Sequence, residues 1–114
     1  MKFVVMYRVP LETMKQWQTA TPTEEMAEQG KKMEADMNAW LAKNESMFID
    51  KGLPLGKNTR MTKDGIEHIS NDLMMYHVVE AENVEAVQEM FKDNPHFTIP
   101  TAFLDIMAVT WKGM

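Results

Sequence analysis

The stretch from Leu73 to Phe97, LMMYHVVEAENVEAVQEMFKDNPHF, decides the fold. It begins with an apolar run that only Tyr76 and His77 interrupt, which is too continuous for a strand with one face in water. We therefore expect a central strand there. Asn83 suits the N-cap of a helix, and Pro95 disfavours helical geometry in the residue before it, so this helix should end shortly before the proline.

Two further apolar runs predict strands, and a long amphipathic stretch between the first run and the hairpin region predicts a helix. The runs are Phe3 to Val9 (FVVMYRV) and Ala102 to Val109 (AFLDIMAV). The helix is expected to begin with Thr21 as its N-cap, because a proline and an acid follow at suitable positions, and to end at Lys51-Gly52. Gly30 on its apolar face suggests a close approach to a strand.

The order of the elements predicts the fold class. Two short alternating segments, Asn58 to Thr62 and Ile66 to Ser70, flank the turn Lys63-Asp64-Gly65 and predict an exposed hairpin. The whole order fits an α+β ferredoxin-like βαββαβ arrangement with an added hairpin, in one domain over residues 1–114. Two helices cover one face of such a sheet, whereas its strands are apolar on both. We therefore expect a homodimer through the other face.

Composition argues against several classes of protein. The chain has 12 basic and 17 acidic residues and no basic stripe, so nucleic acid is not an expected partner. It has no cysteine, which excludes disulfides and thiolate chemistry. The first ten residues lack the apolar region of a signal peptide, and no run approaches the roughly 20 apolar residues of a membrane span. We expect a cytoplasmic protein with no membrane partner.

No cofactor or metal is expected either. The three histidines are not part of a closely spaced ligand set, and no glycine-rich phosphate loop is present. The 13 methionines suit an adaptable pocket, but we interpret them mainly as core filling. Trp17 and Trp111 are candidates for the border of a pocket or for a dimer contact.

A series of short motifs runs along nearly the whole chain. They are MKFVVMYR, ATPTEEM, MNAWLAK, IDKGLPLGK, the hairpin with its DG turn, YHVVEAENVEAVQEMF, and NPHF before a short last strand. In this order they resemble a YCII-related protein of the dimeric α/β barrel superfamily. The resemblance implies a homodimer whose sheets enclose a pocket for a small, often aromatic-derived molecule. It matches the family's acidic strand residue to Asp105 and its proline-histidine pair to Pro95-His96.

Five side chains are candidates for a site, and for four of them, Asp105, His96, His77 and Tyr7, a structural alternative is open. Asp105 in an apolar strand must be paired, protonated or facing a cavity, so it is either a pocket acid near a histidine or a counterion of Arg8. His96 can shuttle protons, cap or pack. His77 forms an acid/base pair with Asp105 if both point into the barrel, or is a satisfied core histidine. Tyr7 either binds a substrate oxygen or fills the core.

Strand alternation separates two sets of residues in the last strand. Phe103, Asp105 and Met107 share one face, which we expect to look into the dimer barrel. Leu104, Ile106 and Ala108 share the other face, and they are wholly aliphatic, as a helix-facing surface should be.

Two functions remain open. One is a cofactor-independent enzyme that isomerises or eliminates from a small organic molecule, with His96, His77 and Asp105 as catalytic residues and Tyr7 and Arg8 binding the substrate. The other is a non-catalytic ligand-binding or accessory dimer. Convergence of histidine, aspartate and tyrosine on one cavity favours the enzyme, whereas scattered, fully hydrogen-bonded positions favour the accessory protein.

Overall fold

The computed structural model describes residues 1–110, and Trp111 therefore lies outside the described residues. The elements in chain order are β1 (Lys2–Arg8), α1 (Leu11–Thr19), α2 (Glu24–Lys43), the 3-10 turn η1 (Glu45–Met47), β2 (Phe48–Asp50), β3 (Asn58–Thr62), β4 (Gly65–Ile69), β5 (Leu73–Glu80), α3 (Val84–Phe91), the 3-10 turn η2 (Pro95–Thr98) and β6 (Phe103–Ala108). Within residues 1–110 no helix is both long and apolar enough to cross a membrane.

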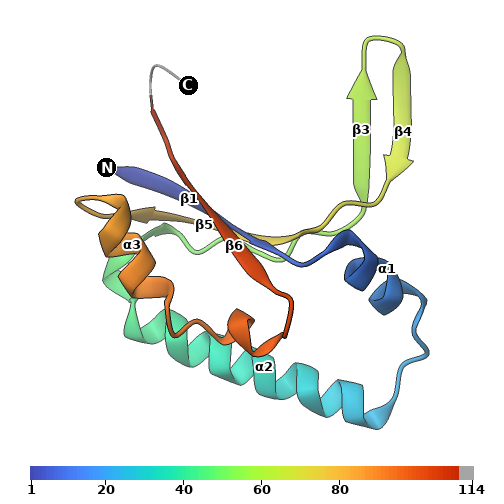
Figure 1. Ribbon diagram of the computed structural model, residues 1–114, viewed down its shortest axis with the longest axis horizontal. Helices are drawn as coiled ribbons and strands as arrows, with labels where there is room; N and C mark the ends of the chain where they lie inside the picture. Colours follow the sequence, from blue (N-terminus) through green and yellow to red (C-terminus); the bar gives the residue numbers. More distant parts are fainter. Residues whose placement is uncertain (111–114) are drawn as a thin grey trace.

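The main sheet has four antiparallel strands in the order β2-β5-β1-β6. Without the hairpin and α1, the chain runs β1, α2, β2, β5, α3, β6, so the first and third strands of the βαββαβ pattern are the two central ones. This confirms the α+β ferredoxin-like prediction. Strands β3 and β4 form a separate two-stranded sheet, which projects away from α2 in Figure 1.

The core lies between the sheet and the helices α2 and α3, which are on the same side of the sheet in Figure 1. Alternate residues of β1 and the residue after it are buried on this side: Phe3, Val5, Tyr7 and Val9. Trp40 from α2 and Phe91 from α3 pack against them, with ring centroids 4.7 Å apart. The opposite face, which we call the open face, carries the intervening residues of β1.

The side chains of the last strand, β6, point to the predicted faces of the sheet. Leu104 and Ile106 pack against the core, whereas Phe103 and Met107 are 37% and 47% exposed. Asp105 is paired with Met6 in the ladder and therefore lies on the open face. The alternation in AFLDIMAV was sufficient to predict which side chains face the helices.

The boundaries of α2 differ from the prediction. Thr23, not Thr21, is the N-cap, and its side chain accepts a hydrogen bond from the backbone N–H of Met26 at 3.2 Å. The helix ends at Lys43 instead of Gly52, because Asn44 caps it and the chain then turns through η1 into β2. Helical spacing continues past the true end because Phe48 belongs to a strand of three residues, which is too short to show a period of its own.

Gly30 does not mark a close approach to a strand. A Cβ atom built on Gly30 would meet no heavy atom within 4 Å outside its own helix. The expected contact is therefore wrong, and the missing side chain leaves space beside α2.

The predicted start of the helix after β5, α3, is confirmed. Asn83 Oδ1 accepts a hydrogen bond from the backbone N–H of Ala86 at 2.9 Å, and α3 ends at Phe91. Pro95 then opens the turn η2, which holds His96 in a buried position.

Candidate functional site

A cavity of about 580 Å³ lies between the sheet and α2, and it has the size of many small-molecule sites. Its polar lining residues are Tyr7, Glu34, Asn38 and His96. The rest of its wall is formed by Gly30, Met33, Met37, Leu41, Gly52, Leu53, Pro54, Met74, Met75 and Ile99. A few polar groups in a mostly apolar wall are typical of a binding site for an organic molecule.

The Tyr7 hydroxyl is held by two buried side chains. It receives a hydrogen bond from Asn94 Nδ2 at 2.6 Å and lies 2.8 Å from Nε2 of His77. Burial raises the pKa of Tyr7 well above its ordinary value, against the lowering effect of the hydrogen bond from Asn94. Tyr7 is therefore a neutral phenol at pH 7, with one proton to donate.

His77 is a satisfied core histidine located behind Tyr7. Its Nδ1 lies 2.5 Å from the carbonyl oxygen of Lys51, which can only accept, so Nδ1 carries the proton and Nε2 accepts from Tyr7. Burial lowers the pKa of His77 despite the bond to Lys51, which keeps the ring neutral. His77 is fully buried and is not part of the cavity wall.

The predicted pair of His77 and Asp105 is wrong. The ladder places His77 opposite Val5 and Asp105 opposite Met6, and these successive residues of β1 point to opposite faces of the sheet. The two side chains are thus separated by the sheet itself.

His96 lines the cavity, and its ring proton is on Nε2, whereas that of His77 is on Nδ1. Nε2 of His96 lies 2.9 Å from the carbonyl oxygen of Arg8 and 3.2 Å from that of Phe103, so Nε2 carries the proton. The backbone N–H of His96 donates to Asn94 Oδ1 at 2.8 Å, which fixes the start of the turn. Burial is the main effect on the pKa of His96 and lowers it.

The second ring nitrogen of His96 is unoccupied by the protein. Within residues 1–110, Nδ1 has no hydrogen-bond partner, whereas every fully buried side-chain nitrogen and oxygen there has one. Nδ1 is therefore not fully buried, and His96 is one of the residues that line the cavity. A neutral imidazole with a free lone pair can accept a hydrogen bond or a proton from a bound molecule.

Asp105 and Arg8 belong to an ion cluster on the open face. Arg8 binds Asp72 through two nitrogens, at 3.1 and 2.9 Å, and binds Asp105 through Nη1 at 2.5 Å. Its guanidinium also lies 5.4 Å from the centre of the Phe103 ring. Asp105 is therefore the counterion of Arg8, and the expectation of an Asp105 carboxylate in a cavity near a histidine is wrong for the single chain.

Three polar residues of the site were missed in the sequence. In the sequence Asn94 is only the residue before Pro95, whereas in the structure its amide links Tyr7 to the backbone of His96. Glu34 and Asn38 line the cavity from α2. Their spacing of four places them on one side of the helix, next to the methionine stripe, and this spacing was the available signal.

Two other features of residues 1–110, a second cavity and the distribution of possible metal ligands, give weaker evidence for a functional site. A second cavity of about 780 Å³ between α1 and the base of the hairpin contains none of the predicted site residues. Residues 1–110 contain no group of three or more His, Cys, Asp or Glu side chains placed to hold a metal ion.

The two buried histidines predict a pH dependence of stability. The folded pKa of each is lowered, so the unfolded chain binds protons first as the pH falls below about 6.5. Stability should be full above that pH and decrease between it and the folded pKa values. Urea unfolding at about pH 7.5 and about pH 5.5 measures this change. His96→Gln should make it smaller, and His68→Gln, at an exposed histidine on the hairpin, controls for the substitution. Equal stability at both pH values would contradict the burial of two neutral imidazoles.

Comparisons with known proteins support the fold. No family model and no curated protein matches the chain. Among solved structures, the chain is similar to 5-chloro-2-hydroxyhydroquinone dehydrochlorinase from Burkholderia phenoliruptrix in complex with 2,5-dihydroxybenzoquinone. The TM-score is 0.54 at 15% identity, over 96% of this chain and 94% of the other. The likeness shows that this chain shares the α+β fold of that protein.

Proposed function

We propose that this chain binds a small organic molecule in the cavity between the sheet and α2 and acts on it by cofactor-independent acid/base chemistry. The supporting observation is the accessible Nδ1 of His96, a neutral imidazole nitrogen in the wall of a mostly apolar cavity. The neighbouring Tyr7 ring, with its centroid 4.9 Å away, supplies a second polar group for orienting the molecule.

His96 has the properties of a general base. At neutral pH its lowered pKa keeps Nδ1 unprotonated, so it can remove a proton from a bound substrate. The resulting imidazolium would keep its Nε2–H on the carbonyl oxygens of Arg8 and Phe103, whose partial negative charge favours the cation. Isomerisation and elimination both begin with such a proton transfer.

The reaction for which the structurally similar protein is named belongs to this class. That protein is a dehydrochlorinase of a hydroxylated aromatic compound, and dehydrochlorination is an elimination. The resemblance of the motifs to YCII-related proteins points to the same type of small, aromatic-derived substrate. We carry only the reaction class to this chain, because the shared fold leaves the substrate open.

We further propose a homodimer through the open face. Val4 and Met6 lie on this face without a helix over them, and Phe103 and Met107 on β6 are partly exposed beside them. Such a combination of apolar residues on a sheet face is typical of a surface that a second copy covers. In that dimer the Arg8 ion cluster would lie at the interface.

One observation favours a non-catalytic ligand-binding or accessory dimer instead. Tyr7 and His96 converge on the cavity, but Asp105 and His77 do not, so a single chain does not assemble an aspartate-histidine pair there. A base without an orienting carboxylate also suits a site that only binds.

Substitution of His96 separates the two functions. His96→Gln retains an N–H group for the Arg8 carbonyl but removes the base. Mass spectrometry after incubation with a cell metabolite extract should show that wild type consumes a metabolite. The variant His96→Gln should consume this metabolite about 100-fold or more slowly but should still bind it. His68→Gln is the matched control. Retention without turnover by wild type supports the accessory dimer, and undiminished turnover by His96→Gln would exclude His96 as the base.

A further inference from the structure

The polarity of the hydrogen bonds around the cavity limits the kind of ligand that it can hold. Tyr7 has a single hydroxyl proton, and two neighbours compete for it: Nε2 of His77 at 2.8 Å and the Met37 sulfur at 3.7 Å. The nitrogen is closer and is the stronger acceptor. Because Asn94 Nδ2 donates to the same oxygen, the hydroxyl proton is committed to His77 and the oxygen can only accept from a ligand.

His96 has the same polarity by a different route. Its one ring proton is shared between the carbonyl oxygens of Arg8 and Phe103 and so is not available to the cavity. Its accessible nitrogen, Nδ1, carries a lone pair and can only accept a hydrogen bond. The two most deeply buried polar residues of the wall, Tyr7 and His96, are therefore both acceptors.

The rest of the wall excludes an anion and favours an aromatic ring. Among residues 1–110, none that lines the cavity is lysine or arginine, and one of them, Glu34, is acidic. A carboxylate or phosphate would lack a cationic partner there. The four methionines of the wall, Met33, Met37, Met74 and Met75, supply polarisable sulfurs that make favourable contacts with aromatic rings.

We infer that the cavity binds a neutral, hydroxylated aromatic molecule whose hydroxyl groups donate to His96 Nδ1 and to the Tyr7 oxygen. The inference rests on the proposed function, because it names the ligand class of that site. A molecule that offers only carbonyl or ether oxygens would leave Nδ1 of His96 without a hydrogen bond and would add none to the Tyr7 oxygen, so its one side-chain donor among the described lining residues would be the amide of the exposed Asn38.

Catechol and its dimethyl ether, veratrole, form a matched pair of probes, with acetophenone as a ligand that only accepts. Titrations of wild-type protein labelled at the methionine methyl carbons measure affinity and location together. Catechol should shift the signals of the four wall methionines but not that of the exposed Met26, and it should bind at least about tenfold more tightly than veratrole or acetophenone.

Two tyrosine variants test the acceptor role. Tyr7→Phe should weaken catechol binding by up to about tenfold and leave veratrole binding unchanged. Tyr76→Phe is the matched control, because the Tyr76 hydroxyl bonds to Asp50 outside the cavity. The comparison of probes on wild type needs no variant, so it holds even if Tyr7→Phe is too unstable to purify.

The outcomes distinguish the inference from the function on which it rests. If veratrole or acetophenone binds at the wall methionines as tightly as catechol, the donor requirement is wrong while the cavity remains a ligand site. If none of the three probes shifts these methionines at millimolar concentration, the aromatic ligand class is wrong, and the turnover of metabolites by wild type and His96→Gln still decides the proposed function separately.

Discussion

Gly52→Ala is expected to destabilise the protein by about 4 kcal/mol or to prevent folding, which would be the largest effect of any substitution considered. Gly52 has φ of 66°, a left-handed conformation that costs a residue with a Cβ roughly 1 kcal/mol. The added Cβ would also lie 1.7 Å from the backbone oxygen of Tyr76 and 2.8 Å from its carbonyl carbon. These atoms belong to the central strand β5 and cannot rotate away as a side chain would.

Gly30→Ala is the matched control for this prediction. It makes the same chemical change within α2, where the new Cβ meets nothing within 4 Å outside the helix. Alanine is the better helix former, so this variant should gain up to about 1 kcal/mol. Urea unfolding of the two variants and wild type measures both effects. A Gly52→Ala protein as stable as wild type would show that the loop after β2 does not approach β5 in this way.

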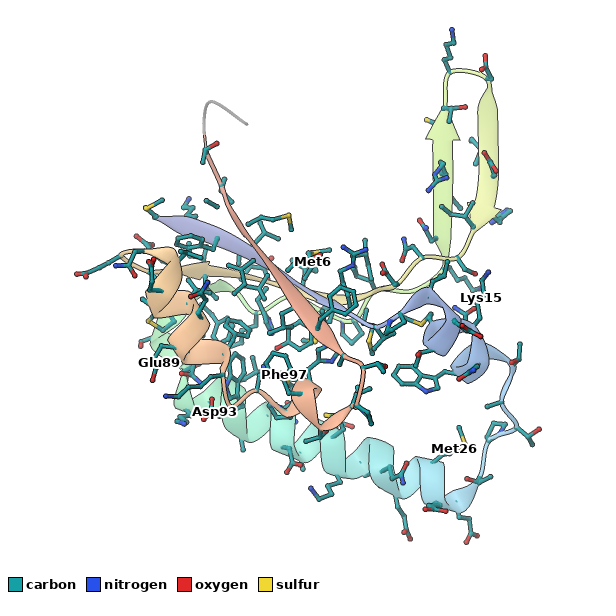
Figure 2. The ribbon with its side chains drawn as sticks, viewed as in Figure 1. Met6, Lys15, Met26, Glu89, Asp93 and Phe97 are labelled. Carbon is teal, nitrogen blue, oxygen red and sulfur yellow. The ribbon has the colours of Figure 1, made fainter. Side chains whose placement is uncertain are left out.

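Met6→Asp is expected to convert the proposed homodimer to a monomer. Met6 lies on the central strand β1, with Tyr76 and Asp105 as its ladder neighbours on the open face. Figure 2 labels Met6 among the strands of the sheet. An aspartate there would place a charge beside Asp105 in the middle of the interface, where it would lose its water without a cationic partner of its own. Met6 is not part of the hydrophobic core, so the fold should survive.

Light scattering at micromolar concentration measures this change in mass. Wild type should have about twice the chain mass and Met6→Asp the mass of one chain, with unchanged circular dichroism. Met26→Asp is the control, because Met26 is exposed on the first turn of α2, at the bottom right of Figure 2. A monomeric wild type would contradict the dimer, and a dimeric Met6→Asp would place its interface elsewhere.

Much of the fold was predictable because long periodic segments leave few alternatives. The apolar run before Asn83 and the helix after it correspond to β5 and α3, and the phase of β6 followed from alternation alone. The edge strand β2 was missed because three residues, Phe48–Asp50, show no period, and the same residues extended the apparent helix.

The candidate site was predictable only in part, because it depends on register between strands. Tyr7 and His96, two of the predicted site residues, line the same cavity, and their roles there stay predictions. Tyr7 and Arg8, however, are neighbours in one strand and so point to opposite faces, which already argues against a common pocket. The pairing of His77 with Val5 and of Asp105 with Met6 comes from contacts far apart in the chain, and no local pattern reveals it.

The tautomers of the two buried histidines test the central claim most directly, because the base and the acceptor wall both depend on them. Nitrogen-proton correlation spectra of ¹⁵N-labelled protein at about pH 7.5 distinguish protonated from unprotonated ring nitrogens. The structure predicts opposite tautomers: His77 protonated on Nδ1, and His96 protonated on Nε2 with a free Nδ1. A His96 that carries its proton on Nδ1, or on both nitrogens, would contradict the account, because the cavity would then contain a donor where the proposed chemistry requires a base.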